Sequence, residues 1–219
     1  MTPAAQAAHD EGETVSGLAL VVRELFTPLG LAVVSEVVEP ESAEYDGMLV
    51  SVSGLDRLDP EGVRTSDAPE AIPHAQAQAQ VRVRSGKITP TKVGLFVTHW
   101  RRTADGTTGP YGVHDSADTL LVTVAESGTD PAGGVFVFDR ASLVAHGIVA
   151  RDGRGGKRGF RVYPPWSTVA PGQASRTQEW QLEHFVPLPI AVSDLGRARR
   201  LLGARSAASG SGTPSETGA

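Results

Sequence analysis

Residues 86–100 constrain the fold of this chain more than any other stretch of its sequence. The stretch begins with a turn that carries a lysine on each side of a proline, Gly86-Lys87-Ile88-Thr89-Pro90-Thr91-Lys92. It continues into the apolar run Leu95-Phe96-Val97-Thr98-His99-Trp100. Because proline fixes the turn and the apolar run has the composition of a buried strand, the stretch predicts a core strand that follows directly from a basic turn.

The segments on either side predict a mixed α/β fold around this strand. Val81–Arg84 alternates apolar and basic residues, which predicts a strand with Arg82 and Arg84 on its solvent face. The remaining apolar patterns predict helices at 18–26, 141–149, 177–185 and about 193–202, and strands at 45–52, 95–100, 119–125, 135–139 and 159–163. Residues 31–38 fit a strand or the end of the helical layer. Residues 54–80 form a proline-rich loop whose Ala/Gln run can begin the next strand.

Chain length and composition indicate one domain, which we expect at 18–202. Residues 1–17 and 203–219 are rich in small and polar residues, and we expect both to be disordered tails. The 219-residue chain has no cysteine, so disulfides, thiolate nucleophiles and sulfur-bound metals are excluded. It also has no apolar run of the roughly 18 residues that span a bilayer and no signal-peptide pattern. We therefore expect a cytoplasmic protein that does not bind membranes.

The net charge of −5 is distributed unevenly along the chain. Residues 1–80 hold 3 Lys/Arg and 14 Asp/Glu, a balance of −11. Residues 81–165 hold 12 against 7, a balance of +5, and residues 166–219 hold 5 against 4, a balance of +1. The basic character is therefore concentrated in the middle of the chain, where it can attract an anionic partner.

Basic residues in this middle region lie near predicted strand ends and in a glycine-rich loop, positions from which side chains and backbone N–H groups can reach phosphates. Trp166, after a proline pair, can stack on a base or pack in the core. Solvated surface charge, and a well-made turn at Thr89-Pro90-Thr91, are the alternative interpretations. The predicted nucleic-acid contacts are Arg82, Arg84, Lys87, Thr89, Thr91, Lys92, Arg154, Lys157, Arg158, Arg161 and Trp166.

Candidate residues for metal or acid–base chemistry are few. His114, Asp115 and Asp118 can form a hydrolytic metal site if another ligand comes near, although loop residues of this kind usually cap turns. His99, beside Trp100, is expected to be a half-buried histidine with satisfied hydrogen bonds. Phosphate-loop, nucleophile-elbow and zincin motifs are absent from the sequence.

Four ordered phrases of the sequence resemble the MepB family. They are Lys87-Ile-Thr-Pro-Thr-Lys92, Gly94-Leu-Phe-Val-Thr-His-Trp100, Gly156-Lys-Arg-Gly-Phe-Arg-Val-Tyr-Pro164 and Thr177-Gln-Glu-Trp-Gln181. The resemblance covers about residues 40–187. It implies nucleic-acid binding and a mixed sheet flanked by helices, similar to the core of PD-(D/E)XK nucleases. The predicted strands and helix between 95 and 163 follow the order of such a core. Ser167 stands where the family often has an acidic residue.

The resemblance also implies where a nuclease site would lie. In PD-(D/E)XK nucleases, an acidic residue on the second strand and a (D/E)-x-K on the third bind a divalent metal. Asp118 suits the first position, but the third strand offers Phe138-Asp139-Arg140. Two residues before Lys87, Lys92 and Lys157 stand Ser85, Pro90 and Gly155, so the chain has no (D/E)-x-K. Asp118 and Asp139 thus represent a vestigial acidic site, and we expect no catalytic residue, metal or cofactor.

We therefore expect a non-catalytic nucleic-acid-binding protein that contacts the phosphate backbone with little sequence preference. RNA and single-stranded DNA are the expected partners, with duplex DNA as a further candidate. One alternative is a Mg²⁺-dependent nuclease with relocated ligands from Asp118, Glu126 or Asp139. Another is a module whose basic face binds a small anionic ligand or a protein partner.

Overall fold

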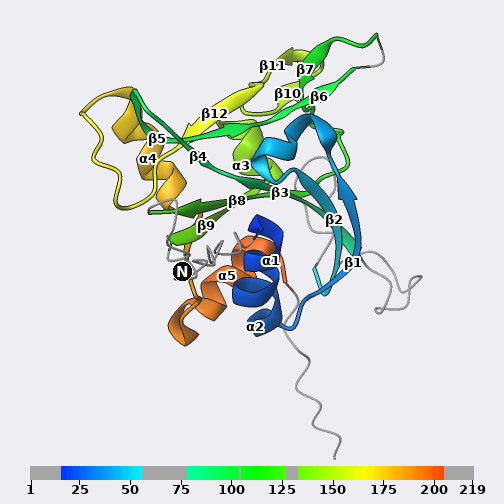
Figure 1. Cartoon of the computed structure of the whole chain (residues 1–219), viewed down its shortest axis with the longest axis vertical. Helices are drawn as coiled ribbons and strands as arrows, with labels where there is room; N and C mark the ends of the chain where they lie inside the picture. Colours follow the sequence, from blue (N-terminus) through cyan, green and yellow to red (C-terminus); the bar gives the residue numbers. More distant parts are fainter. Residues whose placement is uncertain (1–15, 56–77, 104, 127–132, 205–219) are drawn as a thin grey trace, which may run out of the picture.

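A six-stranded mixed sheet runs through the middle of the fold, and helices cover it (Figure 1). The computed structural model describes residues 16–55, 78–103, 105–126 and 133–204. The sheet order is β1-β2-β3-β8-β9-β13, and only β3 and β8 are parallel neighbours. The strands are β1 (Ala32–Val38), β2 (Met48–Ser53), β3 (Gln78–Ser85), β8 (Thr119–Ala125), β9 (Gly133–Asp139) and β13 (Phe185–Leu188).

The central strands β8 and β9 are buried on both faces, as their nearly continuous apolar sequences require. Side chains alternate between two apolar clusters. Leu121 and Val137 face the first cluster, while Leu120, Phe136 and Phe138 face the second. Burial of each such side chain stabilises the fold by about 1.5–3 kcal/mol.

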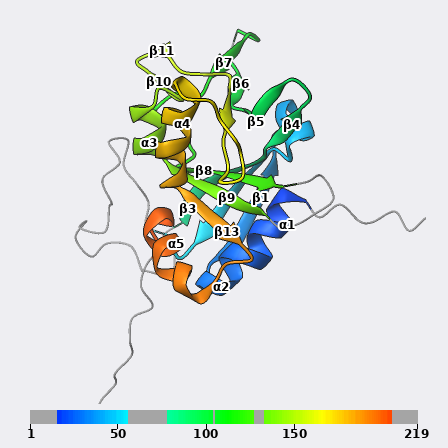
Figure 2. The same cartoon turned by 90° about the vertical axis from the view of Figure 1, so that its left-hand side faces the viewer.

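The first cluster is covered by helices from both ends of the described chain (Figure 2). The predicted N-terminal helix is confirmed as α1 (Gly17–Val21), a π-helical turn η1 (Val22–Phe26) and α2 (Thr27–Leu29). The C-terminal helix is also confirmed, as the short 3-10 turn η5 (Val192–Asp194) followed by α5 (Leu195–Leu202). None of the described helices is long and apolar enough to cross a membrane.

Helix caps lie close to the two expected domain limits, residues 18 and 202, which stay a prediction. Ser16 accepts a hydrogen bond from Ala19 N at 3.2 Å and so caps α1, and Gly17 already lies in the helix. At the other end, Gly203 caps α5 and Ala204 pairs with Leu55. The rest of the two predicted tails, 1–15 and 205–219, lies outside the described residues.

A second, smaller β layer covers the other face of the main sheet (Figure 1). Its three strands have the order β12-β5-β4 and are antiparallel. Two hairpins and a 3-10 helix flank this layer, and helices α3 and α4 pack against the cluster between the sheets. The elements are η2 (Pro40–Tyr45), β4 (Lys87–Thr89), β5 (Lys92–Thr98), β6 (Trp100–Arg102), β7 (Thr108–Pro110), α3 (Arg140–Ala145), β10 (Ala150–Arg151), β11 (Arg154–Gly155), β12 (Gly159–Val162) and α4 (Gln173–Leu182).

The predicted fold class, a mixed central sheet flanked by helices, is confirmed. Several details differ from the sequence-based expectations. The helix expected at 141–149 is α3 and ends at Ala145, and the strand expected at 45–52 is β2 and begins at Met48. The strands expected at 95–100 and 159–163 are β5 and β12 of the smaller sheet, so they are not neighbours of β8 and β9. The helix expected at 177–185 starts earlier, at Gln173, and ends at Leu182. Phe185 instead begins β13, an edge strand in which Pro187 points to solvent.

Candidate functional site

Three predicted phosphate-binding residues meet on the three-stranded sheet. Arg161 on β12 pairs in register with Phe96 on β5, and Phe96 pairs with Lys87 on β4. The Arg161 guanidinium donates hydrogen bonds to Thr89 Oγ1 at 2.6 Å and to Gly94 O at 2.9 Å. Arg161 therefore links all three strands and holds the β4–β5 turn in place, while Lys87 is exposed beside it.

The β4–β5 turn exposes Thr91 and Lys92, two further predicted residues. Directly after it, Gly94 has a φ of 78°, in the left-handed region that favours glycine. A Cβ at Gly94 would lie 2.7 Å from the carbonyl oxygen of Val162 and 2.6 Å from the Tyr163 ring. Glycine is thus required for β5 to approach β12 closely behind the basic turn.

Two half-buried aromatic rings lie among these cations. The Phe96 ring meets the Tyr45 ring of η2 edge to face, with 6.2 Å between centroids. Lys87 Nζ lies 5.7 Å from the Tyr45 centroid, and the Arg161 Cζ lies 6.0 Å from the Phe96 centroid. Gly159 makes room for the Phe96 ring, since a Cβ there would lie 2.5 Å from its Cζ. We name Tyr45, Lys87, Thr89, Phe96 and Arg161 the basic-aromatic face.

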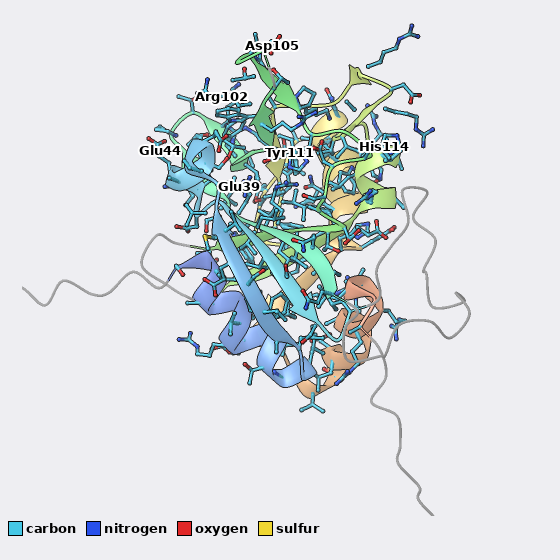
Figure 3. All side chains as sticks on the ribbon, turned by 90° about the vertical axis from the view of Figure 1, so that its right-hand side faces the viewer. Glu39, Glu44, Arg102, Asp105, Tyr111 and His114 are labelled. Atoms are coloured by element: carbon cyan, nitrogen blue, oxygen red, sulfur yellow. The ribbon has the colours of Figure 1, made fainter. Side chains whose placement is uncertain are left out.

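Negatively charged side chains also lie near this face. The 3-10 helix η2, which supplies Tyr45, also exposes Glu41 and Glu44. Figure 3 shows Glu44 on the same side of the molecule as Arg102 of β6. The acidic residues weaken the attraction of a polyanion. Replacing one of them with a neutral residue should therefore strengthen binding.

The second predicted basic cluster lies toward the other end of β12. Arg154, Lys157 and Arg158 are exposed on β11 and on the segment that leads into β12. Arg158 Nη1 donates to Thr108 Oγ1 of β7 at 3.2 Å. Arg158 precedes Arg161 by three residues, which corresponds to about 10 Å along a strand. The two clusters are neighbouring and do not form one compact site.

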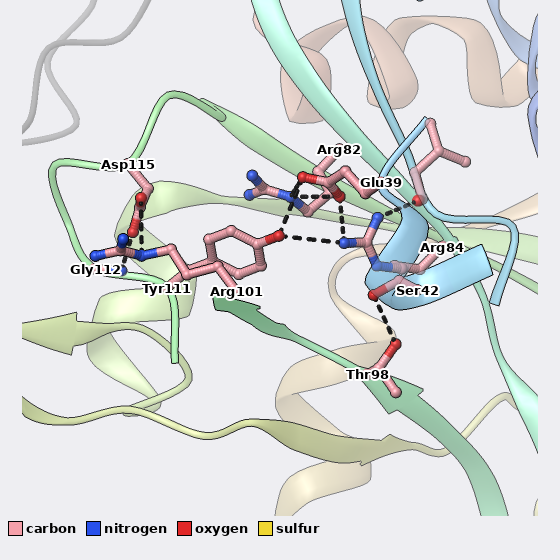
Figure 4. Close-up of polar contacts among 10 residues, drawn as sticks. Glu39, Ser42, Arg82, Arg84, Thr98, Arg101, Tyr111, Gly112 and Asp115 are labelled. Carbon is pink, nitrogen blue, oxygen red and sulfur yellow. Dashed lines mark hydrogen bonds and ion pairs between the residues drawn. The ribbon is translucent and has the colours of Figure 1, made fainter. Parts of the chain in front are cut away.

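The prediction that Arg82 and Arg84 lie on a solvent face is wrong. Both side chains are buried, with 4% and 0% of their surface exposed, because η2 and the smaller sheet cover that face of β3. The Glu39 carboxylate accepts hydrogen bonds from Arg82 Nε at 3.1 and 3.2 Å and from Arg84 Nη2 (Figure 4). It also accepts from the Tyr111 hydroxyl at 3.1 Å. These arginines form a buried ionic cluster and are not accessible to a polynucleotide.

The charge state of this cluster follows from opposing effects. Burial favours the protonated carboxyl of Glu39, but Arg82 and Arg84 outweigh it and lower the pKa of Glu39 below its ordinary value. Burial raises the pKa of Tyr111, so its hydroxyl remains a donor. At neutral pH the cluster therefore holds two guanidinium ions and one carboxylate.

The two residues of the predicted vestigial acidic site have structural partners. Asp118 is buried, accepts a hydrogen bond from Gln80 N at 2.9 Å and lies 3.2 Å from Arg140 Nη2. Asp139 caps α3 by accepting from Ser142 N at 2.7 Å. Among the described residues, no three His, Asp or Glu side chains are grouped closely enough to hold a metal ion. Both carboxylates are thus already used by the fold.

His114, Asp115 and Trp166 are the remaining candidate residues. His114 is exposed, and Asp115 accepts from Gly112 N and pairs with Arg101 at 3.3 Å. Trp166 packs at 5.8 Å from the Phe185 ring, against the cluster between the sheets, and its stacking on a base stays a prediction.

His99 differs from the expectation of a half-buried, satisfied histidine. It is 1% exposed, and both ring nitrogens lack a hydrogen-bond partner within the described part of the chain. Burial, with Arg82 and Arg84 nearby, holds the pKa of His99 well below 6.5. The ring is therefore neutral at physiological pH.

Sequence reasoning did not identify Glu39, Tyr45, Phe96 or Tyr111 as parts of these clusters. Glu39 lies 43 residues before Arg82, and Tyr111 lies 27 residues after Arg84, so no local pattern connects them. Phe96 offered one signal, since it alternates with buried Leu95 and Val97 and must point to the opposite face of β5.

Comparison with known proteins agrees with this architecture. A family model described as MepB-like matches residues 64–187. A comparison with curated proteins found no match. A solved structure described as "Crystal Structure of MepB" aligns with a TM-score of 0.55 and 27% sequence identity, and the alignment covers 71% of this chain and 87% of that one. The family resemblance predicted from the four ordered phrases is thus confirmed, and the chain belongs to the MepB-like family.

Proposed function

We propose that this chain binds single-stranded nucleic acid without cutting it, on a degenerate nuclease-like scaffold, and contacts the phosphate backbone with little sequence preference. One observation carries the proposal: Lys87, Thr89 and Arg161 lie beside the rings of Tyr45 and Phe96 on the basic-aromatic face. Cations attract phosphates of any sequence, and an aromatic ring offers a stacking surface to any base.

The aromatic rings favour single strands over duplexes. Bases in a duplex are already stacked on each other, so only unpaired bases can splay onto a protein ring. Phe96 and Tyr45 are half-buried, which leaves part of each ring for such a contact. Arg158, on the segment that leads into β12, is an exposed further cation near this face.

Binding can be measured by fluorescence anisotropy with labelled single-stranded RNA, single-stranded DNA and duplex DNA over a range of salt concentrations. We expect affinity for single strands to fall steeply with salt. Lys87→Ala should weaken binding and reduce the slope of log K against log salt by about 0.7, the contribution of one phosphate contact on a single strand. Glu44→Gln should strengthen binding, because it removes a nearby negative charge.

Arg176→Ala is the matched control, since Arg176 bears the same kind of charge and is exposed on α4, which packs against the opposite face of the smaller sheet. Equal losses for Lys87→Ala and Arg176→Ala would indicate unspecific charge attraction. An absence of binding to all three probes at low salt would reject the proposal.

The same preparations distinguish the alternative functions. Cleavage of RNA or DNA with Mg²⁺ or Mn²⁺, above the level of an Asp118→Ala variant, would support a nuclease with relocated ligands. Thermal stabilisation by nucleotides or other metabolites, without stabilisation by a polynucleotide, would support a small-ligand module.

A further inference from the structure

His99, between β5 and β6, is a buried polar side chain without a partner among the described residues. Its ring lies 4.8 Å from the Tyr111 ring and 6.2 Å from the Phe160 ring, centroid to centroid. An unsatisfied buried polar group costs about 1–3 kcal/mol. A ligand that hydrogen-bonds to an imidazole nitrogen of His99 would therefore stabilise the fold, since the surrounding described side chains make no such bond.

A cavity of about 10 Å³ adjoins this ring. That volume accommodates one particle about the size of a water molecule and is too small for phosphate, a nucleotide or an organic acid. The polar side chains that line it together with His99 are Arg82, Tyr111, Thr119, Asp115 and Arg140.

Arg82 presents free donors to the cavity. Its Nε donates to the Glu39 carboxylate, and its Cζ lies 3.6 Å from the centroid of the Tyr111 ring, so one edge and one flat side are engaged. Its two Nη atoms make no hydrogen bond to a described residue. Figure 4 shows the Nη end pointing away from Glu39. The free edge of a guanidinium group is a strong anion donor.

Among the residues that the structure describes, the charges around the cavity leave one positive charge without a matching carboxylate. Arg82 and Arg84 share the single carboxylate of Glu39. The other two lining charges are matched, because Arg140 pairs with Asp118 and Asp115 pairs with the more distant Arg101. A buried unmatched charge is costly unless a counterion accompanies it.

We propose that this cavity binds one small inorganic anion of halide size, held by the Nη groups of Arg82 and a ring N–H of His99. Chloride is only somewhat larger than a water molecule, and it matches the donors and the surplus charge together. A water molecule fits the size and the donors but leaves the charge unmatched. A neighbouring cleft of about 400 Å³ shares Gly112 and Asp115 with the cavity, so an anion in the cleft would be close to the proposed site.

The proposal is independent of nucleic-acid binding and can be tested on the full chain. The thermal unfolding midpoint is measured in equal concentrations of sodium chloride and sodium gluconate, whose anion is too large for the cavity. We expect a higher midpoint in chloride, since a ligand of the folded state alone stabilises it. His99→Phe fills the site and removes the N–H, so the difference between the two salts should disappear.

Lys87→Ala serves as the control for surface anions and should keep the full chloride effect. Equal midpoints in the two salts, or an undiminished chloride effect in His99→Phe, would overturn the proposal. If His99→Phe does not fold, crystals of the unaltered protein soaked in bromide decide the question. An anomalous scattering peak beside Arg82 and His99 supports the site, and density without anomalous signal shows that water fills it.

Discussion

The half-buried carboxylate of Glu39 is expected to be among the most stability-sensitive groups in the fold, because its two arginine partners are buried, and Glu39→Gln tests this. Glu39 is the only carboxylate in described contact with Arg82 and Arg84, which are 4% and 0% exposed. Removing one partner of a buried ion pair costs about 3–5 kcal/mol, because the other charge stays buried and unmatched. Here two guanidiniums lose one shared partner, so the loss should lie toward the upper end.

That loss is large compared with the whole stability of a typical domain, about 5–15 kcal/mol. Urea unfolding followed by tryptophan fluorescence measures the loss in free energy of unfolding of Glu39→Gln relative to the natural chain. With an m-value of about 2 kcal/mol/M, a loss of about 5 kcal/mol lowers the urea midpoint by about 2.5 M. Glu24→Gln is the matched control, since Glu24 pairs with Arg23, whose side chain is 57% exposed, and should cost no more than about 1 kcal/mol. Equal midpoint shifts for the two variants would refute the reasoning.

The pH dependence of the same measurement has a defined sign. Folding lowers the pKa of Glu39 below the ordinary 4.5, so its contribution is complete above pH 4.5 and is lost as pH falls through the folded-state pKa. The stability difference between the natural chain and Glu39→Gln should therefore narrow in acid. A difference that stays constant down to acid unfolding would contradict the assigned charge state.

Three further predictions concern packing and backbone, and each is measured as a change in free energy of unfolding. Phe138→Ala should cost about 3–5 kcal/mol, since Phe138 is fully buried and contacts Trp180 between the sheets. Gly94→Ala should cost clearly more than Gly106→Ala; both have positive φ, but only Gly94 has atoms closer than 3 Å to the added Cβ, so equal losses would contradict the steric argument. Asp139→Ala removes the cap of α3 and should cost about 1 kcal/mol, and no loss would show that the cap is dispensable.

The sequence predicted the elements whose own residues determine them. β8 and β9 were identifiable because each is an almost continuous apolar run of strand length, which burial on both faces demands. The first helix was identifiable by its apolar spacing and by Gly30, which adopts the left-handed conformation that ends it. The β4–β5 turn was identifiable by proline between two hydroxyl residues.

Alternation alone could not reveal what covers each face of a strand. It placed Arg82 and Arg84 on one face of β3 correctly, but the smaller sheet and η2 cover that face and turn two apparent surface cations into a buried cluster. The partner, Glu39, is 43 residues from Arg82 in sequence. Contacts over such separations depend on the tertiary fold, so they escape any local pattern.

The end of α4 was misplaced for a different reason. Trp180, His184 and Phe185 fit helical spacing, and all three do pack toward the cluster between the sheets. The helix nevertheless ends at Leu182. Three residues later, Phe185 and Val186 pair with β9 as a strand. Short apolar segments satisfy either period, and the available sheet edge decided between them.

The parallel pairing of β3 with β8 has a consequence for how the chain folds. The connection between them, residues 86–118, carries the basic turn, β5 and both strands of the β6–β7 hairpin. Closing a loop of roughly 30 residues costs about 3 kcal/mol of chain entropy, and the contacts between β3 and β8 offset this cost only after the loop has closed. The β8–β9 pair, which is local, should therefore form early, and the β3–β8 junction late. The basic-aromatic face would then assemble in the slow step, so variants that loosen the β4–β5 turn should slow refolding, as stopped-flow fluorescence would show.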